Sequence, residues 1–245
     1  MKNRLMCHLI AGYPGMEESY KIARTMAEAG SAYIEVQFPF SDPSADGPVI
    51  QAACTKAIEK GFTVKKGFEL IKRISSEFDT PVFIMSYSTI ACRNGIESFI
   101  KRSKKAGAAG LIIPDLLPPD DEGLYKTAEE AGLPVMPVFP VSILPERLEI
   151  IKNLKAEYIY VALRRGITGR KTLISKDQID FLDNLKNTGA KILAGFGISD
   201  RDQVDAVVPH VDAAIIGSAL VRTIGDAGDN YETALKNKLE SLIGQ

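Results

Sequence analysis

Short apolar runs alternate with longer amphipathic stretches along the whole chain. The apolar runs have the length of strands, and several are apolar almost throughout, which is typical of strands buried on both faces of a parallel sheet. The pattern predicts eight strands: Leu5–Ile10, Ala32–Phe38, Pro81–Tyr87, Gly110–Ile113, Leu133–Phe139, Glu157–Leu163, Lys191–Ala194 and Asp212–Ile216.

The amphipathic stretches between these runs predict helices. Four of them end at a glycine that is expected in the left-handed conformation closing a helix, namely Gly30, Gly107, Gly132 and Gly189. The helices are expected to begin near Met16, Val64, Ile96, Asp121, Pro145, Lys176 and Asp200, and a last helix is expected over 230–242.

This repetition of strand and helix favours a closed (β/α)8 TIM barrel, which takes about 250 residues and would here be a single domain over residues 1–245. The alternative is a doubly wound open sheet. That fold more often has fewer strands and a G-x-G-x-x-G turn after the first strand, whereas this chain has Gly12-Tyr13-Pro14-Gly15 there. No linker or low-complexity tract divides the chain.

Composition narrows the functional class. Hydrophobic residues make up 45% and charged residues 25% of the 245, as in an ordinary globular protein. The net charge of -1 argues against a nucleic acid or an anionic membrane as partner. Cys7, Cys54 and Cys92 are too widely spaced for a metal knuckle, and an odd, sparse set fits a reducing compartment. With no signal segment or bilayer-length apolar run, the expected location is cytoplasmic.

Two carboxylates are the leading candidates for chemistry, because the active site of such a barrel lies at the C-terminal ends of its strands. Glu35 lies inside an apolar strand, where burial of a carboxylate is costly. It is therefore expected either to pair with a nearby Lys or Arg or to have a catalytic role. Asp46 follows in the next loop. It could cap a helix that has Pro48 in its first turn, or face Glu35 across the barrel mouth.

Glycine-rich turns follow the last three predicted strands. They are Gly166–Gly169, Gly195–Ser199 and Gly217–Leu220, the last at the expected start of a short helix. Backbone N–H groups in such turns and at helix N-termini bind phosphate dianions. The three turns predict a phosphorylated substrate, and three tight turns without a ligand are the alternative.

The histidines and lysines of the chain predict no metal site and no Schiff-base chemistry. His8 and His210 are far apart and have no acidic ligand at metal spacing, so both are expected to have satisfied structural roles and no metal site is expected. A lysine that forms a Schiff base would be expected at a strand end, whereas Lys191 begins a strand. We expect no cofactor.

The run from Ile34 to Pro48 resembles the signature of tryptophan synthase alpha subunits, which has a glutamate in the second strand followed by P-F-S-D-P and A-D-G-P. The resemblance extends over essentially the whole chain. It also includes Gly12-Tyr13-Pro14, Met85-Ser86-Tyr87, Pro114-Asp115-Leu116, Gly166–Gly169, Gly195–Ile198 and Gly217–Ala219.

The resemblance implies retro-aldol cleavage of indole-3-glycerol phosphate to indole and glyceraldehyde 3-phosphate, without a metal or organic cofactor. Glu35 would be the general acid and base, which protonates C3 of the indole ring and helps to remove the glycerol hydroxyl proton. Asp46 would hold the indole N–H. Tyr87 and Tyr160 would line the pocket, and Gly169, Gly197, Gly217 and Ser218 would hold the phosphate. A beta subunit would take the indole in an α2β2 complex.

The chain departs from the family pattern in several places. It begins almost at the first strand, without the usual extra N-terminal helix, and His8 stands where phenylalanine is common. Thr89 replaces the usual Asn near the face that meets the beta subunit, and Arg164-Arg165 precede loop 6 where a serine is typical. Two alternatives therefore stay open: a barrel kept mainly to activate a beta-type subunit, and another sugar-phosphate barrel such as an isomerase or epimerase.

Overall fold

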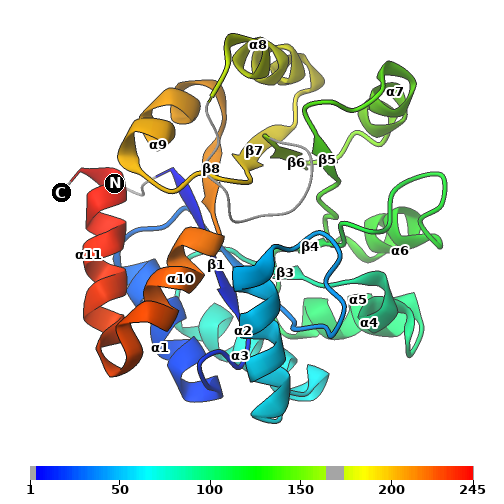
Figure 1. Cartoon of the computed structure of the whole chain (residues 1–245). Coiled ribbons are helices and arrows are strands. Elements are labelled where there is room, and N and C mark those ends of the chain that lie inside the picture. Colours follow the sequence, from blue (N-terminus) through cyan, green and yellow to red (C-terminus); the bar gives the residue numbers. More distant parts are fainter. Residues whose placement is uncertain (1–3, 164–173, 245) are drawn as a thin grey trace.

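The computed structural model describes residues 4–163 and 174–244. In this part of the chain eight parallel strands form one sheet in the order β4-β3-β2-β1-β8-β7-β6-β5, surrounded by helices (Figure 1). The strands are β1 Leu5–Ile10, β2 Tyr33–Gln37, β3 Val82–Met85, β4 Gly110–Ile112, β5 Val138–Pro140, β6 Tyr158–Ala162, β7 Lys191–Gly195 and β8 Ala213–Ile216.

Backbone contacts join the two outer strands of this order. Leu111 of β4 forms an isolated parallel bridge with Val135, just before β5. Its N–H donates to the carbonyl of Pro134 at 2.9 Å, and its carbonyl accepts from the N–H of Met136 at 2.8 Å. The sheet therefore closes on itself, which confirms the predicted barrel and makes the doubly wound open sheet wrong.

The helices alternate with the strands as predicted. They are α1 Met16–Glu28, α2 Pro48–Glu59, α3 Val64–Glu77, α4 Ser88–Cys92, α5 Ile96–Lys105, α6 Leu124–Ala131, α7 Pro145–Asn153, α8 Lys176–Leu185, α9 Arg201–Val207, α10 Ser218–Ala227 and α11 Tyr231–Ile243. The start of α6 was expected at Asp121, but that carboxylate accepts the N–H of Tyr125 at 2.9 Å from before the helix. No helix in the described ranges is long and apolar enough to cross a membrane.

Glycine closes the predicted helix ends. Left-handed φ angles of +78°, +82°, +65° and +77° occur at Gly30, Gly107, Gly132 and Gly189. A residue with a Cβ is strained at such an angle, so these positions confirm the sequence interpretation.

Strand β5 differs most from its prediction. The apolar run Leu133–Phe139 indicated a long strand, but β5 begins only at Val138. Pro134 and Pro137 interrupt this stretch. Proline has no N–H to donate to a neighbouring strand, so a continuous ladder cannot form here.

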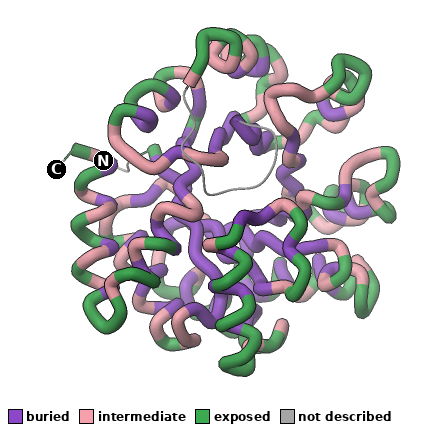
Figure 2. Tube along the Cα trace, in the orientation of Figure 1, coloured by how far each residue is buried: buried purple, intermediate pink, exposed green. Residues whose placement is uncertain are grey.

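The alternation of side chains along each strand builds two cores, one outside and one inside the barrel. In β2, Ile34 and Val36 belong to the outer core that packs against the helices, whereas Tyr33 packs against the inner core. Buried residues occupy the centre of the molecule and exposed ones the outward faces of the helices (Figure 2). Because side chains alternate, Glu35 and Gln37 face the barrel interior with Tyr33.

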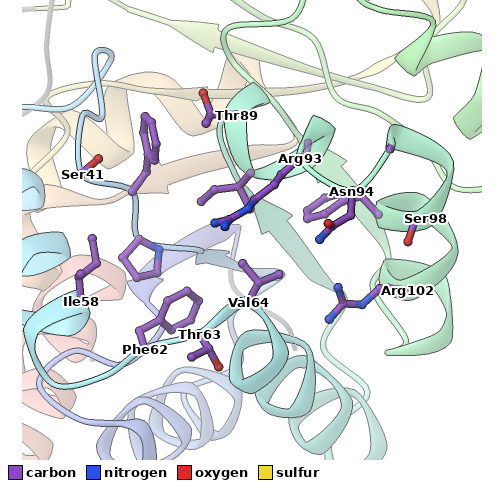
Figure 3. Close-up of a pocket in the computed structure, with 16 residues that line it drawn as sticks. Ser41, Ile58, Phe62, Thr63, Val64, Thr89, Arg93, Asn94, Ser98 and Arg102 are labelled. Carbon is purple, nitrogen blue, oxygen red and sulfur yellow. The ribbon is translucent and has the colours of Figure 1, made fainter.

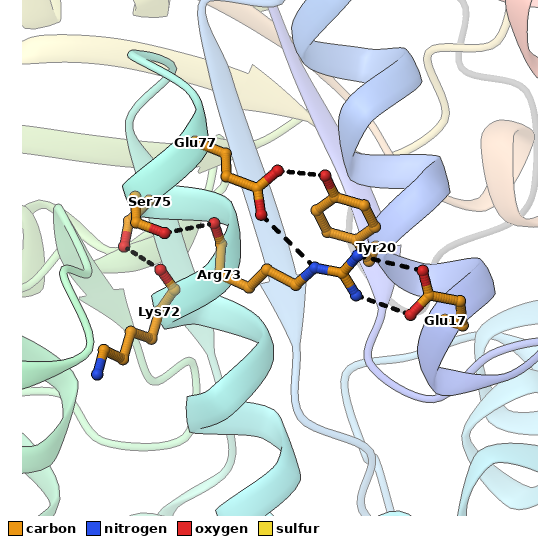
Figure 4. Close-up of polar contacts among 7 residues, drawn as sticks. Glu17, Tyr20, Lys72, Arg73, Ser75 and Glu77 are labelled. Carbon is orange, nitrogen blue, oxygen red and sulfur yellow. Dashed lines mark hydrogen bonds and ion pairs between the residues drawn. The ribbon is translucent and has the colours of Figure 1, made fainter.

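A polar cluster joins α1 to α3 at the surface (Figure 4). The guanidinium of Arg73 lies 3.3 Å from the centre of the Tyr20 ring and 2.7 Å from the Glu17 carboxylate. The hydroxyl of Tyr20 donates to Glu77. Exposed ion pairs add little stability, so the two helices are held mainly by the buried residues of the outer core.

Candidate active site

A small cavity of about 40 Å³ is lined by residues from strands β1 to β6, by residues of the loops after β2, β4, β7 and β8, and by the first turns of α2 and α10. Residues at the C-terminal ends of the strands contribute most of it, as expected for a barrel enzyme. Six of its lining residues carry the argument below: His8, Glu35, Asp46, Tyr160, Gly217 and Ser218.

Glu35 is buried, with 3% of its surface exposed, and faces this cavity. Among the described residues, the basic group beside Glu35 is His8 and not the Lys or Arg that the sequence offered as one alternative. The Cα atoms of the two residues are partners in the β1–β2 register. The Nδ1 atom of His8 lies 3.3 Å from the Oε2 atom of Glu35.

Asp46 faces the same cavity and does not cap α2. The N-cap of α2 is Gly47, and no side chain caps the helix. Instead, the Oδ2 atom of Asp46 accepts hydrogen bonds from Gln37 Nε2 at 2.8 Å and from the Tyr87 hydroxyl at 2.9 Å. Of the two interpretations left open by the sequence, the helix cap is wrong. The second carboxylate lies at the barrel mouth with Glu35.

Burial is the largest influence on the pKa values of Asp46 and Tyr87. It raises the pKa of Asp46 above its usual value, although the hydrogen bonds from Gln37 and Tyr87 and the charge of His8 act in the opposite direction. Burial and the nearby Asp46 carboxylate raise the pKa of Tyr87 far above its usual value. Tyr87 is therefore a neutral donor at any ordinary pH.

Tyr160 brings an aromatic wall to the cavity from inside β6. Its ring packs edge-on against Phe196, with 5.9 Å between the centroids. Burial holds the pKa of Tyr160 well above its usual value, so its hydroxyl stays neutral. Phe196 has a φ of +73°, a conformation that is rare for a non-glycine residue and is often found where a ligand binds.

The structure places only some of the predicted phosphate-binding residues at the cavity. Gly217 and Ser218 line the cavity, and Ser218 begins α10, whose N-terminus has no side-chain cap. Gly197 has a φ of +98° and adjoins the lining residue Phe196, but is not itself among the lining residues. Gly169 lies outside the described residues. A helix N-terminus of this kind presents free N–H groups that suit an anion.

Three residues of the site were missed or misassigned from the sequence. Gln37 could have been found, because strand alternation places it on the same face as Glu35. Phe196 has no sequence signal beyond its place in the turn after β7. The expected structural role fits His210, whose ring lies 3.0 Å from the Asp183 carboxylate. His8 instead lines the cavity, and its Nε2 atom has no hydrogen-bond partner among the described residues.

A larger hollow of about 660 Å³ lies outside the barrel mouth, between the α2–α3 turn and α4–α5 (Figure 3). Thr89 of α4, Arg93 and Arg102 line it, and no Asp or Glu of the described residues does. Arg93 extends into the hollow in Figure 3. The guanidinium of Arg102 lies 4.3 Å from the centre of the Phe68 ring, and neither arginine forms a salt bridge with another described residue.

The whole chain matches known proteins in sequence. The family model described as tryptophan synthase alpha chain matches residues 1–244. The tryptophan synthase alpha chain of Helicobacter hepaticus is 38% identical over 98% of this chain and 93% of its own length. That of Methanococcus maripaludis is 35% identical over 95% of this chain and 90% of its own length.

Solved structures agree with the sequences. A mutant tryptophan synthase alpha-subunit from Pyrococcus furiosus superimposes with a TM-score of 0.90 at 29% identity, covering 99% of this chain and 98% of that one. An alpha chain of the tryptophan synthase α2β2 complex from the same organism gives 0.89 at 28% identity, with the same coverage. These matches do not favour a sugar-phosphate isomerase or epimerase. The chain belongs to the tryptophan synthase alpha chain family.

Proposed function

We propose that the chain cleaves indole-3-glycerol phosphate into indole and glyceraldehyde 3-phosphate, as a carbon–carbon lyase of tryptophan biosynthesis. The observation that carries this proposal is the position of two buried carboxylates, Glu35 and Asp46, on one cavity that also reaches the start of α10 at Ser218. The site thus offers groups for proton transfer beside a place for a phosphate. The whole of residues 1–245 would act as a single catalytic domain.

Glu35 supplies the proton chemistry. Indole is a poor carbanion, so the bond between C3 and the glycerol chain breaks only after C3 has been protonated. Glu35 in its acid form donates that proton, and its carboxylate then accepts the proton of the hydroxyl on the adjacent carbon. As the hydroxyl becomes an aldehyde, the bond electrons return to the ring and Glu35 is protonated again. A buried acid close to the reacting atoms suits this exchange.

Asp46 binds the other side of the indole ring. Protonation of C3 leaves positive charge on the ring nitrogen, and a carboxylate that accepts the N–H stabilises this charge. Both donors to Asp46, Gln37 and Tyr87, bind its Oδ2 atom, so the carboxylate is held in one orientation. Tyr160 packs against the ring, and Tyr87 acts through Asp46.

The phosphate occupies the end of the cavity beside the start of α10. Gly217 and Ser218 line that end, where the N-terminus of α10 favours negative charge. We assign Gly197 and Gly169 to the same role on the strength of the family resemblance. The distance between the carboxylates and this helix start would set the length of the substrate.

A beta subunit is the partner that receives indole, in an α2β2 complex. We place part of its contact at the hollow around Thr89, because that residue stands near the face that meets the beta subunit in the family pattern. Arg93 and Arg102 make this hollow basic, so it suits an acidic segment of the partner. All three cysteines are free, in keeping with a cytoplasmic location.

The test is release of indole from indole-3-glycerol phosphate, with and without a beta subunit. Glu35→Gln keeps the shape of the side chain but cannot exchange the proton. It should reduce turnover by at least roughly 10²-fold, as removal of a general acid usually does. Glu69→Gln, on the exposed surface of α3, is the matched control and should keep full activity.

Three results would separate the possibilities. Loss of activity in Glu35→Gln alone supports the lyase. Near-normal turnover of a folded Glu35→Gln variant contradicts the role of Glu35. A folded wild-type chain that releases no indole but raises the activity of a beta subunit would instead identify a barrel kept as an activating partner.

A further inference from the structure

His8 lies in β1, between β2, which carries Glu35, and β8, which leads into Gly217. On one side its Cα is the register partner of Glu35 in β2. On the other side, a Cβ built on Gly217 would lie 3.8 Å from the Cβ and Cγ atoms of His8. The imidazole thus stands beside both the acid–base residue and the phosphate-binding turn, and it lines the cavity.

The two ring nitrogens of His8 have different surroundings. Nδ1 lies at an ion-pair distance of 3.3 Å from Glu35 Oε2, and that buried oxygen has no hydrogen bond from another described residue. Nε2 is buried, as is the whole of His8 with 5% of its surface exposed, and this nitrogen has no hydrogen-bond partner among the described residues. Buried polar atoms nearly always have a partner, and one without a protein partner calls for an explanation such as a catalytic role or a bound group. Because His8 lines the cavity, a substrate bound there could supply the partner.

We propose that His8 and Glu35 form a pair that shares one proton, and that the Nε2–H group of His8 binds an oxygen of the glycerol phosphate part of the substrate. The inference rests on the proposed function and adds a residue to its proton chemistry. It replaces the structural role expected for His8 from the sequence.

The shared proton follows a balanced path. In the resting pair, His8 carries protons on both nitrogens and Glu35 is a carboxylate. The Nδ1 proton passes to Glu35, and Glu35 passes it to C3 of the indole ring, which leaves a neutral imidazole with its Nε2–H still bound to the substrate. The Glu35 carboxylate then accepts the hydroxyl proton as the carbon–carbon bond breaks. Return of this proton to Nδ1 restores the resting pair.

The charged groups around His8 favour such a pair. Glu35 faces it from β2 and Asp46 from the loop before α2, and Tyr160 on β6 is neutral. Gly217, on the β8 side, brings no charge. Burial alone would lower the pKa of His8, but the two carboxylates outweigh burial and raise this pKa above its usual value. The pair therefore keeps its proton to a higher pH than a lone imidazole.

The first test is the pH dependence of kcat for indole release. An imidazole is more basic than a carboxyl group, so removing it should move the alkaline limb of the profile to lower pH. We expect a move of about one unit or more in His8→Phe and His8→Gln, so the loss relative to wild type should grow with pH and reach about tenfold or more at pH 8.5. Met6→Leu, one inward position earlier in β1, is the control and should keep the wild-type profile.

A second measurement does not depend on activity. The chain has two histidines, so His210→Asn leaves only the His8 ring to be titrated by NMR. We expect a His8 pKa above 6.5 that falls when Glu35→Gln is added. An unchanged His8 pKa in that double variant, or an unchanged alkaline limb in an active His8→Phe variant, would overturn the shared proton. A wild-type chain that releases no indole overturns the proposed function instead, and the titration still decides whether the pair shares a proton.

Discussion

The hydroxyl of Tyr87 donates a hydrogen bond to the Oδ2 atom of Asp46, with 2.9 Å between the oxygens. Tyr87 follows β3, whereas Asp46 lies in the loop between β2 and α2. The bond therefore ties a loop residue to the rigid end of a neighbouring strand. The backbone N–H of Ala45 also donates to the Tyr87 hydroxyl, at 3.2 Å, so the same tyrosine holds the loop and its carboxylate.

Tyr87→Phe should therefore impair catalysis without unfolding the protein. The variant loses one of the two donors to Asp46 Oδ2, and kcat/KM for indole release should fall roughly 10- to 100-fold, because a hydrogen bond to a charged group contributes about 1.5–3 kcal/mol. Tyr125→Phe is the control, since that buried hydroxyl has no partner among the described residues. Equal kcat/KM values for the two variants would show that Tyr87 does not position Asp46.

The pH dependence of the same variant gives a second prediction. Asp46 must be ionised to stabilise the ring, and its pKa is raised by burial, so activity should fall as the pH drops through this raised pKa. The Tyr87 hydrogen bond lowers the pKa of Asp46, and its loss in Tyr87→Phe should move the acid limb of kcat/KM to higher pH. An acid limb that stays in place or moves to lower pH would contradict the assignment of that limb to Asp46.

Gly217→Ala should affect binding more than chemistry. A Cβ at this position would make only ordinary contacts with His8, at 3.8 Å or more, so the protein should fold. The methyl group would occupy part of the end of the cavity assigned to phosphate. We expect the Kd of glycerol phosphate to rise about tenfold, which is about 1.4 kcal/mol of binding free energy. Calorimetric titration would measure it, and an unchanged Kd would place the phosphate elsewhere.

The basic hollow around Arg93 and Arg102 allows a test of the proposed contact with the beta subunit. Arg93→Glu reverses the charge inside the basic hollow and should weaken binding of a beta subunit about tenfold or more, with a steeper loss at low salt. Indole release by the isolated chain should not change. Lys101→Glu makes the same charge change at an exposed position of α5 that does not line the hollow, so it controls for net charge. Equal effects of the two substitutions would remove the hollow from the interface.

Gly67 offers a test of the outer core. In a free helix, replacing glycine with alanine adds about 1 kcal/mol of stability. In α3, however, a Cβ at residue 67 would lie 2.8 Å from the ring of Phe38, which is fully buried. Gly67→Ala should therefore lower the free energy of unfolding by about 1–3 kcal/mol, as overpacking does. Ser76→Ala, on the exposed side of the same helix, should change it by about 0.5 kcal/mol or less.

The barrel could be predicted because its signal is local. Each strand shows in its own apolar run, and glycines such as Gly30 and Gly132 mark helix ends without reference to the rest of the chain. The short helix α4 was missed because five residues are too few to show an amphipathic period. Strand β5 was overestimated because apolar character was weighed more heavily than its prolines.

The site was predicted where residue type alone was informative. A carboxylate in an apolar strand singled out Glu35, and a second carboxylate in the loop after that strand singled out Asp46. The sequence could not choose between the two roles of Asp46, because the answer depends on Tyr87 and Gln37 reaching the same atom from other strands. The surroundings of His8 could not be predicted for a similar reason. Only the register of β1 with β2 shows that its ring meets Glu35.

The single bridge at Leu111 places the thinnest part of the barrel wall between β4 and β5. Thermal opening of the wall should begin there, because local unfolding starts where hydrogen bonding is sparse. The strands that carry His8 and Glu35 lie elsewhere in the ring, where Met6 to Ile10 run in register with Tyr33 to Gln37. Amide hydrogens near Leu111 should thus exchange with solvent long before those of β1 and β2. The barrel wall can open locally between β4 and β5 while His8 and Glu35 keep their alignment in β1 and β2.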